Sequence, residues 1–258
     1  MKRLVLLFLL LSATSSSAQQ FDTIISTAAY QSYFNSAKHE PVIVVYKLFH
    51  GGGDCDRSKF HFKNDTGLPT AKPVDYAGNG YDEGHMANAE DFASDCTLDE
   101  LTFRFYNCVP QTPNLNRGVY KVWETKIRSE SQSDSLLIVC GNIFGTMTIG
   151  QDKIAVPDSC FKVVESLSTH TVMHVLMFSN TSTASVEEET LDQLQKTLGY
   201  TIPLVLSAVV APSSLVGSSP EVVKSAESPG QCQAYTKQGK RCSRMAQAGS
   251  IYCWQHQK

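Results

Sequence analysis

The most informative stretch of this sequence is residues 80–91, Gly-Tyr-Asp-Glu-Gly-His-Met-Ala-Asn-Ala-Glu-Asp. Four acidic residues and two glycines surround a single histidine, His85. A short strand that is bounded by glycines and carries one histidine suits an exposed general base. A solvated acidic loop with an incidental histidine fits the same residues. The segment by itself supports both interpretations equally.

A second stretch, residues 105–128, reads Phe-Tyr-Asn-Cys-Val-Pro-Gln-Thr-Pro-Asn-Leu-Asn-Arg-Gly-Val-Tyr-Lys-Val-Trp-Glu-Thr-Lys-Ile-Arg. It predicts a strand, a turn at Pro113 and a helix capped by Asn114 or Asn116. Glu124 and Arg128 are four residues apart, and an unbroken helix would bring Asn116 close to the same face. An amide oxygen, a carboxylate and a guanidinium together suit a hard cation and a phosphate. A surface helix with one intrahelical ion pair is the simpler alternative.

Together the two stretches resemble the signature of the non-specific DNA/RNA endonucleases of the ββα-metal class, which include endonuclease G. That signature is Asp-Arg-Gly-His, then Pro-Gln, Leu-Asn and a glutamate further along the chain. This chain has Asp-Glu-Gly-His at 82–85, Pro-Gln at 110–111, Leu-Asn at 115–116 and Glu124. The resemblance covers residues 41–203. It implies an α+β fold with a central antiparallel sheet.

The resemblance also implies roles for the matching residues. His85 would be the general base that activates water, Asn116 would bind a single Mg²⁺ directly, and Glu124 would hold the water shell of the metal. Arg128 would steady the phosphate, and Asp82 belongs to the same catalytic motif. The implied activity is metal-dependent hydrolysis of DNA and RNA to 5′-phosphate ends, with Mn²⁺ as an alternative metal. A homodimer is compatible with the resemblance.

The chain departs from the signature at Glu83, where the family usually has arginine or lysine. A carboxylate there would repel phosphate unless it points away, pairs with a basic side chain or helps the metal. Arg57 or Lys59 could fill a second basic position before the motif. Glu83 therefore keeps two other readings open: an inactive nucleic-acid-binding protein on the same fold, and a phosphodiesterase or effector with a narrower substrate.

The amino-terminal residues 1–18 have the pattern of a secretory signal peptide. Lys2 and Arg3 precede an apolar run from Leu4 to Leu11, and a Ser-x-Ala cleavage pattern ends at Ala18. Eight apolar residues are too few for a bilayer, which needs about 20. We therefore expect an exported chain, secreted or periplasmic, without a membrane partner.

Composition and charge suggest a folded body and a separate tail. With 258 residues, 42% of them hydrophobic and 18% charged, the chain is neither disordered nor a coiled coil. Without the signal peptide the net charge is −5, of which residues 232–258 contribute +5 and residues 19–231 contribute −10. We expect an endonuclease domain at 19–210 and a Ser/Pro/Gly-rich linker at 211–231. A local basic groove would then have to come from Arg104, Arg117, Lys121, Lys126 and Arg128.

The body contains an odd number of cysteines: Cys55, Cys96, Cys108, Cys140 and Cys160. Export favours disulfides, but the sequence does not select the pairing. Cys55–Cys96 is the favoured guess, because both residues lie beside loops that flank the histidine motif.

The tail at 232–258 has three cysteines and a histidine that could hold Zn²⁺ tetrahedrally: Cys232, Cys242, Cys253 and His256. It looks similar to a short Cys₃His zinc knuckle, and a module of this size would need such a metal to fold. The alternative is a disulfide within the tail, with the third cysteine paired to the body. The basic and aromatic residues of the tail could bind nucleic acid or a protein.

The remaining pattern predicts the other elements. We expect a helix within 21–37, strands at 42–49, 101–109, 135–140, 153–156, 161–165 and 172–178, and a helix over 186–198 that ends at Gly199. Mixed strands with few helices indicate an α+β domain around an extensive sheet.

Overall fold

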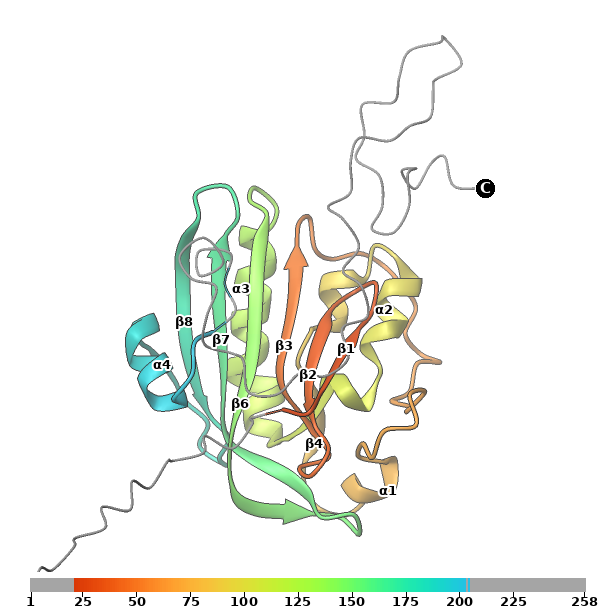
Figure 1. Ribbon diagram of the computed structural model, residues 1–258. Helices are drawn as coiled ribbons and strands as arrows, with labels where there is room; N and C mark the ends of the chain where they lie inside the picture. The colour runs from red at the N-terminus through yellow and green to blue at the C-terminus, as the bar shows by residue number, and fades with distance from the viewer. Residues whose placement is uncertain (1–20, 203, 205–258) are drawn as a thin grey trace, which may run out of the picture. The chain divides into compact units, whose positions relative to one another are not determined.

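The computed structural model describes residues 21–202 and residue 204 (Figure 1). The expected signal peptide, linker and zinc-binding tail lie outside the described residues. In the part that is described, no helix is long and apolar enough to cross a membrane.

A seven-stranded antiparallel sheet forms the centre of the domain. Its strand order is β1-β2-β3-β6-β7-β8-β9. The strands are β1 (Thr23–Ser26), β2 (Gln31–Asn35), β3 (Glu40–Leu48), β6 (Leu136–Ile149), β7 (Ile154–Ser166), β8 (Thr171–Ser179) and β9 (Val186–Glu188). The predicted α+β fold with a central antiparallel sheet is confirmed.

Helices cover both faces of this sheet. On β6, Leu136 and Ile138 face the core cluster that includes Ile127 of α3 (Lys121–Glu130). Their neighbour Leu137 faces the opposite cluster with Leu194 of α4 (Leu191–Leu198). This alternation follows from the two-residue period of a strand, and it explains why the central strands are apolar on both faces. In Figure 1, α3 lies behind β6 and β7, and α4 lies beside β8.

A second, two-stranded sheet joins β4 (Asp82–His85) to β5 (Cys108–Gln111). Short elements surround it: α1 (Pro73–Tyr76), α2 (Cys96–Thr102), the 3₁₀ turns η1 (Ala89–Phe92) and η2 (Phe105–Asn107), and the π-helical turn η3 (Leu115–Tyr120). The two motif stretches of the sequence thus become neighbouring strands that are followed by helical segments.

Two predicted elements are wrong. Residues 21–37 form the hairpin β1–β2 rather than a helix, because pairing with β3 outweighs their weak helical period. Residues 101–109 are mostly not a strand, since they contain the end of α2, the turn η2 and only the start of β5. The predicted helix at 186–198 begins later, after β9, at a capping box formed by Thr190 and Gln193. It ends as expected at Gly199, whose φ of 72° is left-handed.

The helix after Pro113 is not continuous. Gly118 has non-helical dihedral angles, φ −105° and ψ −116°, between η3 and α3. Asn114 makes no side-chain capping hydrogen bond, and Asn116 lies inside the π-helical turn. The prediction of a capped, unbroken helix from Asn116 to Glu124 is therefore wrong. The spacing argument that placed these two residues on one face does not apply.

The close packing of Gly84 against Gln111 gives a first testable prediction. A Cβ at Gly84 would lie 2.4 Å from Oε1 of Gln111, a residue with no exposed surface. Gly84→Ala should lower the free energy of unfolding by ~1–3 kcal/mol, measured by urea denaturation. In a Gln111→Ala background the same change should cost much less, because the clash is gone. Equal costs in both backgrounds would contradict this account.

Candidate active site

The small sheet pairs the two motif stretches directly. Asp82 lies opposite Gln111, and His85 lies opposite Cys108. Because side chains alternate along a strand, Glu83 and His85 share one face of β4, and Asp82 shares the other face with Gly84. The motif therefore presents its carboxylates on two sides of one strand.

His85 is a neutral imidazole between two aromatic rings. Its ring centroid lies 4.6 Å from that of Phe62 and 4.7 Å from that of Phe103. Burial, with a smaller contribution from the Arg57 cation, lowers the pKa of His85 to about 3. Its Nε2 atom is buried and has no hydrogen-bond partner among the described residues. An imidazole in this state is unprotonated at neutral pH, as a general base must be.

Asp82 orients the amide of Asn116. Nδ2 of Asn116 donates to Oδ2 of Asp82 at 3.0 Å, and Nε of Arg117 donates to the same oxygen at 2.8 Å. Burial acts to raise the pKa of Asp82, but the hydrogen bonds from Arg117 and Asn116 outweigh it and lower the pKa. With Nδ2 held by a carboxylate, the carbonyl oxygen is the end of the Asn116 amide suited to a cation.

Glu124 is buried rather than on a solvated helix surface. Its Oε1 lies 3.7 Å from Nζ of Lys162, whose side chain is 1% exposed. Burial raises the pKa of Glu124, while Lys162 and a hydrogen bond with Asn88 act in the opposite direction. Glu124 therefore belongs to a buried polar cluster with Lys162 and Asn88.

Arg128 joins the same cluster but does not form the simple ion pair with Glu124 that its spacing suggested. Nε of Arg128 donates to Oδ1 of Asp91 at 2.8 Å, and its Nη2 donates to Oδ1 of Asn88 at 3.1 Å. The hydroxyl of Tyr46 donates to the other oxygen of Asp91 at 2.8 Å. Asp91 and Asn88 thus fix the direction of the guanidinium.

Glu83 is half-buried on the His85 face of β4. Burial raises the pKa of its carboxyl, and the nearby His61 acts against that shift. The protonated form of Glu83 is thereby favoured more than in water. That lessens the repulsion of phosphate expected from a carboxylate at this position.

The arginines of the expected basic groove make ion pairs within the domain. Arg104 is buried against Asp65, Arg117 pairs with Asp82 and Arg128 pairs with Asp91. Lys126 lies over the ring of Trp123 at 4.1 Å. Lys121 is exposed and makes no ion pair or aromatic contact with the described part of the chain.

A hard cation fits the oxygen donors at this site. An amide oxygen at Asn116 and a carboxylate at Glu124 are the ligand types that Mg²⁺ prefers, and Mg²⁺ commonly keeps several waters. Within residues 21–202, no three histidine, cysteine or acidic side chains are grouped closely enough to hold a metal by themselves.

Several residues of the site carry too weak a sequence signal to be identified. Asn88 and Asp91 lie inside the quoted motif stretch, but only the tertiary contacts show that they hold Arg128 and Glu124. The signal for Lys162 is a lone cation in an apolar strand. Arg57, by contrast, was one of two candidates for a basic position before the motif, and its contacts with Glu90 and Asp99 place it.

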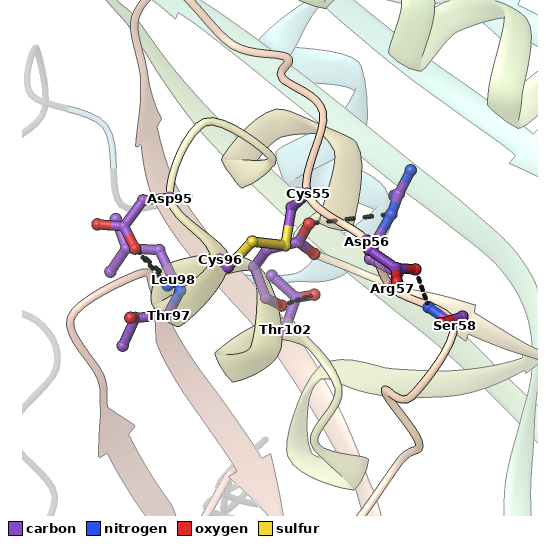
Figure 2. Close-up of a disulfide and its surroundings, with 10 residues drawn as sticks. Cys55, Asp56, Arg57, Ser58, Asp95, Cys96, Thr97, Leu98 and Thr102 are labelled. Atoms are coloured by element: carbon purple, nitrogen blue, oxygen red, sulfur yellow. Dashed lines mark hydrogen bonds and ion pairs between the residues drawn. A yellow bond between two sulfur atoms is a disulfide. The ribbon is translucent and has the colours of Figure 1, made fainter.

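The favoured disulfide is confirmed. Cys55 and Cys96 are bridged, as Figure 2 shows, whereas Cys108, Cys140 and Cys160 are buried and form no disulfide with another described residue. The bridge joins the loop before Arg57 to the first residue of α2.

The proteins and the family model that this chain resembles are all nucleases. The family model described as DNA/RNA non-specific endonuclease matches residues 11–203. Human mitochondrial endonuclease G is 33% identical over 128 residues, which cover 43% of this chain and 43% of that protein. A nuclease of Nostoc sp. is 31% identical over 146 residues, 54% of this chain and 53% of the nuclease. The human mitochondrial nuclease EXOG is 27% identical over 188 residues, 67% of this chain and 44% of that protein.

This chain spans about half the length of the curated relatives it matches. Among solved structures, a chain of the EndoG/EndoGI complex superimposes with a TM-score of 0.62 and 22% identity. The match covers 70% of this chain and 86% of that one. It shows that the fold is shared.

Proposed function

Because this chain belongs to the DNA/RNA non-specific endonuclease family, we propose that it is a metal-dependent endonuclease that hydrolyses phosphodiester bonds in DNA and RNA without sequence specificity. The observation that best supports this is His85, a buried neutral imidazole whose Nε2 has no partner among the described residues. A buried ring nitrogen without a hydrogen-bond partner is available to accept the proton of a reacting water.

The chain's own side chains divide the work of the reaction. His85 accepts the proton of the attacking water at Nε2. Arg128, held by Asp91 and Asn88, directs a guanidinium toward the phosphate as negative charge develops. Asn116 and Glu124 would hold Mg²⁺, directly and through water, and that ion supplies charge neutralisation at the phosphate and the leaving oxygen. Asp82 keeps the amide of Asn116 in the orientation for this role.

A second candidate is a nucleic-acid-binding protein without catalysis on the same fold. The observation that favours it is Glu83, which stands where the family usually has a basic residue. Incubation of the purified protein with plasmid and total RNA separates the two functions. Cleavage that stops with EDTA supports the nuclease, whereas retention of intact DNA on a gel supports the second candidate.

The metal assignment gives the next prediction. Asn116→Ala and Glu124→Gln should each raise the Mg²⁺ concentration for half-maximal cleavage by ~10-fold or more, because each removes an oxygen that holds the ion or its waters. Asn114→Ala is the matched control: it is a nearby exposed asparagine whose side chain donates to the carbonyl of Ser182. If the Mg²⁺ titrations of the two variants overlay those of the control, the cation binds elsewhere.

We also propose, from the sequence, that the chain is exported and that its tail binds zinc. Residues 1–18 would direct the chain out of the cytoplasm, and amino-terminal sequencing of the mature protein would check their removal. Cys232, Cys242, Cys253 and His256 would hold one Zn²⁺, which metal analysis of the purified chain would detect or refute.

A further inference from the structure

Two segments of the chain, residues 55–63 and 96–104, are joined at both ends. We refer to them as the clipped segments. The disulfide Cys55–Cys96 joins their beginnings, and a parallel bridge between Lys63 and Arg104 joins their ends. At that bridge, the amide of Lys63 donates to the carbonyl of Phe103 at 3.3 Å. The second segment contains the whole of α2 (Figure 2).

Between these joints, Arg57 crosses from one segment to the other. Its Nε lies 3.9 Å from Oδ2 of Asp99 on α2, and its Nη2 donates to Glu90 in η1. The Asp99 side chain has no exposed surface, and neither of its oxygens has a hydrogen-bond partner among the described residues. The Arg57 cation is therefore the charge that compensates this buried carboxylate. Burial raises the pKa of Asp99 to about 6, and Arg57 acts against that shift.

The clipped segments also build the surroundings of His85. Phe62, at the end of the first segment, and Phe103, at the end of the second, supply the two rings that flank the imidazole. Glu90, which Arg57 contacts, lies in the turn just after β4 and His85. The Arg57 cation also lowers the pKa of His85, as a smaller cause than burial. The Arg57 cation and the two aromatic rings that flank His85 thus come from the same pair of clipped segments.

We propose that the Cys55–Cys96 disulfide is a positioning element for the reaction: it holds Arg57 against Asp99 and Glu90 within the two segments whose Phe62 and Phe103 flank His85, and cleavage by this chain depends on the bridge. The proposal rests on the proposed function. Arg57 and Glu90 are each about one-third exposed, and such ion pairs hold long side chains only weakly. The disulfide closes a loop between residues 41 positions apart and limits the freedom of the segment that carries Arg57.

A double-mutant cycle tests the proposal. Cys55→Ser with Cys96→Ser removes the bridge, and Arg57→Gln removes the cation. Loss of the bridge should lower kcat by ~10–100-fold in the otherwise unchanged chain, because displacement of a positioned group is costly. In the Arg57→Gln background, loss of the bridge should change kcat less than ~2-fold, since the group that it positions is already absent. The control is Glu100→Gln, which removes an exposed ion pair with Lys63 from the same segments and should leave kcat unchanged.

A second measurement does not depend on activity. An NMR titration of His85 should show a higher pKa after the bridge is removed from the chain with Arg57, and no further change in the Arg57→Gln background. Circular dichroism at 25 °C should show all the variants folded. Equal losses of kcat in both backgrounds would overturn the proposal. So would a pKa of His85 that is the same with and without the bridge in the chain that keeps Arg57. An oxidised wild-type chain that cuts no nucleic acid would instead refute the proposed function, while the titration would still report whether the bridge positions Arg57.

Discussion

Replacing His85 with alanine should lower the rate of phosphodiester hydrolysis by ~10²–10⁴-fold and leave the fold in place. The imidazole is held between Phe62 and Phe103, and its Nε2 is buried and unpartnered among the described residues, so the variant loses the proposed proton acceptor. The measurement is kcat on plasmid DNA and on a small phosphodiester at saturating Mg²⁺. Added imidazole should restore part of the activity by filling the space that the side chain leaves.

His170→Asn is the control for this change. His170 is an exposed histidine in the turn between β7 and β8, at a φ of 54°, where asparagine is well tolerated. It should cut nucleic acid as fast as the unchanged chain. An unaltered rate in His85→Ala would remove His85 from the mechanism.

The same variant has an expected signature in stability against pH. The pKa of His85 is lowered to about 3 from 6.5, so between these values the unfolded chain binds more protons at this residue than the folded chain does. Its contribution to stability is present above pH ~6.5 and is lost as the pH falls toward 3. The His85→Ala variant has no imidazole to protonate, so it does not lose this stability as the pH falls. Its melting temperature should therefore improve relative to the unchanged chain as the pH is lowered from 7 to 4.

The second large effect should come from Lys162→Met, with an expected loss of ~3–5 kcal/mol in the free energy of unfolding. The Lys162 side chain is 1% exposed, and its Nζ lies 3.7 Å from Oε1 of Glu124, 3.4 Å from the carbonyl of Met86 and 3.1 Å from Sγ of Cys140. Methionine fills a similar volume but leaves the Glu124 carboxylate buried without its cation. Urea denaturation monitored by circular dichroism measures the loss.

Two further variants separate charge from packing at Lys162. Lys47→Met makes the same replacement at an exposed position of β3 and should be within ~0.5 kcal/mol of the unchanged chain. Adding Glu124→Gln to Lys162→Met removes the stranded charge and should recover part of the stability. A denaturation midpoint for Lys162→Met equal to that of the Lys47 control would show that the buried pair contributes nothing.

Much of the fold could be predicted because its signals are local. The strand at Val42–Phe49 and those after Ser135 are runs of β-branched and apolar residues, and they appear as β3, β6, β7 and β8. Gly199 ends α4 because a left-handed residue is easiest for glycine. These features depend on neighbouring residues, so the pattern of the chain is enough to find them.

The motif stretches also placed the site in outline. The resemblance to the endonuclease signature singled out Asp82, His85 and Asn116, and the structure brings Asp82 and Asn116 into hydrogen-bond contact. Their partners were not identified, because Asn88, Asp91 and Lys162 act through contacts across the fold. The disulfide was a guess from the neighbouring loops, since cysteine count alone cannot select a pairing.

By itself, then, the sequence determined the family, the strands with strong apolar patterns and the catalytic histidine candidate. Tertiary structure decided the rest. Residues 21–37 became a hairpin because β3 offered an edge to pair with, and the kink at Gly118 broke the helix that was to align Asn116 with Glu124. Arginines expected in a basic groove pair with carboxylates far away in the sequence, namely Asp65, Asp82 and Asp91. The physical reason is the same throughout: ion pairs and strand pairing join residues far apart in the chain, and their free energy is absent from any local pattern.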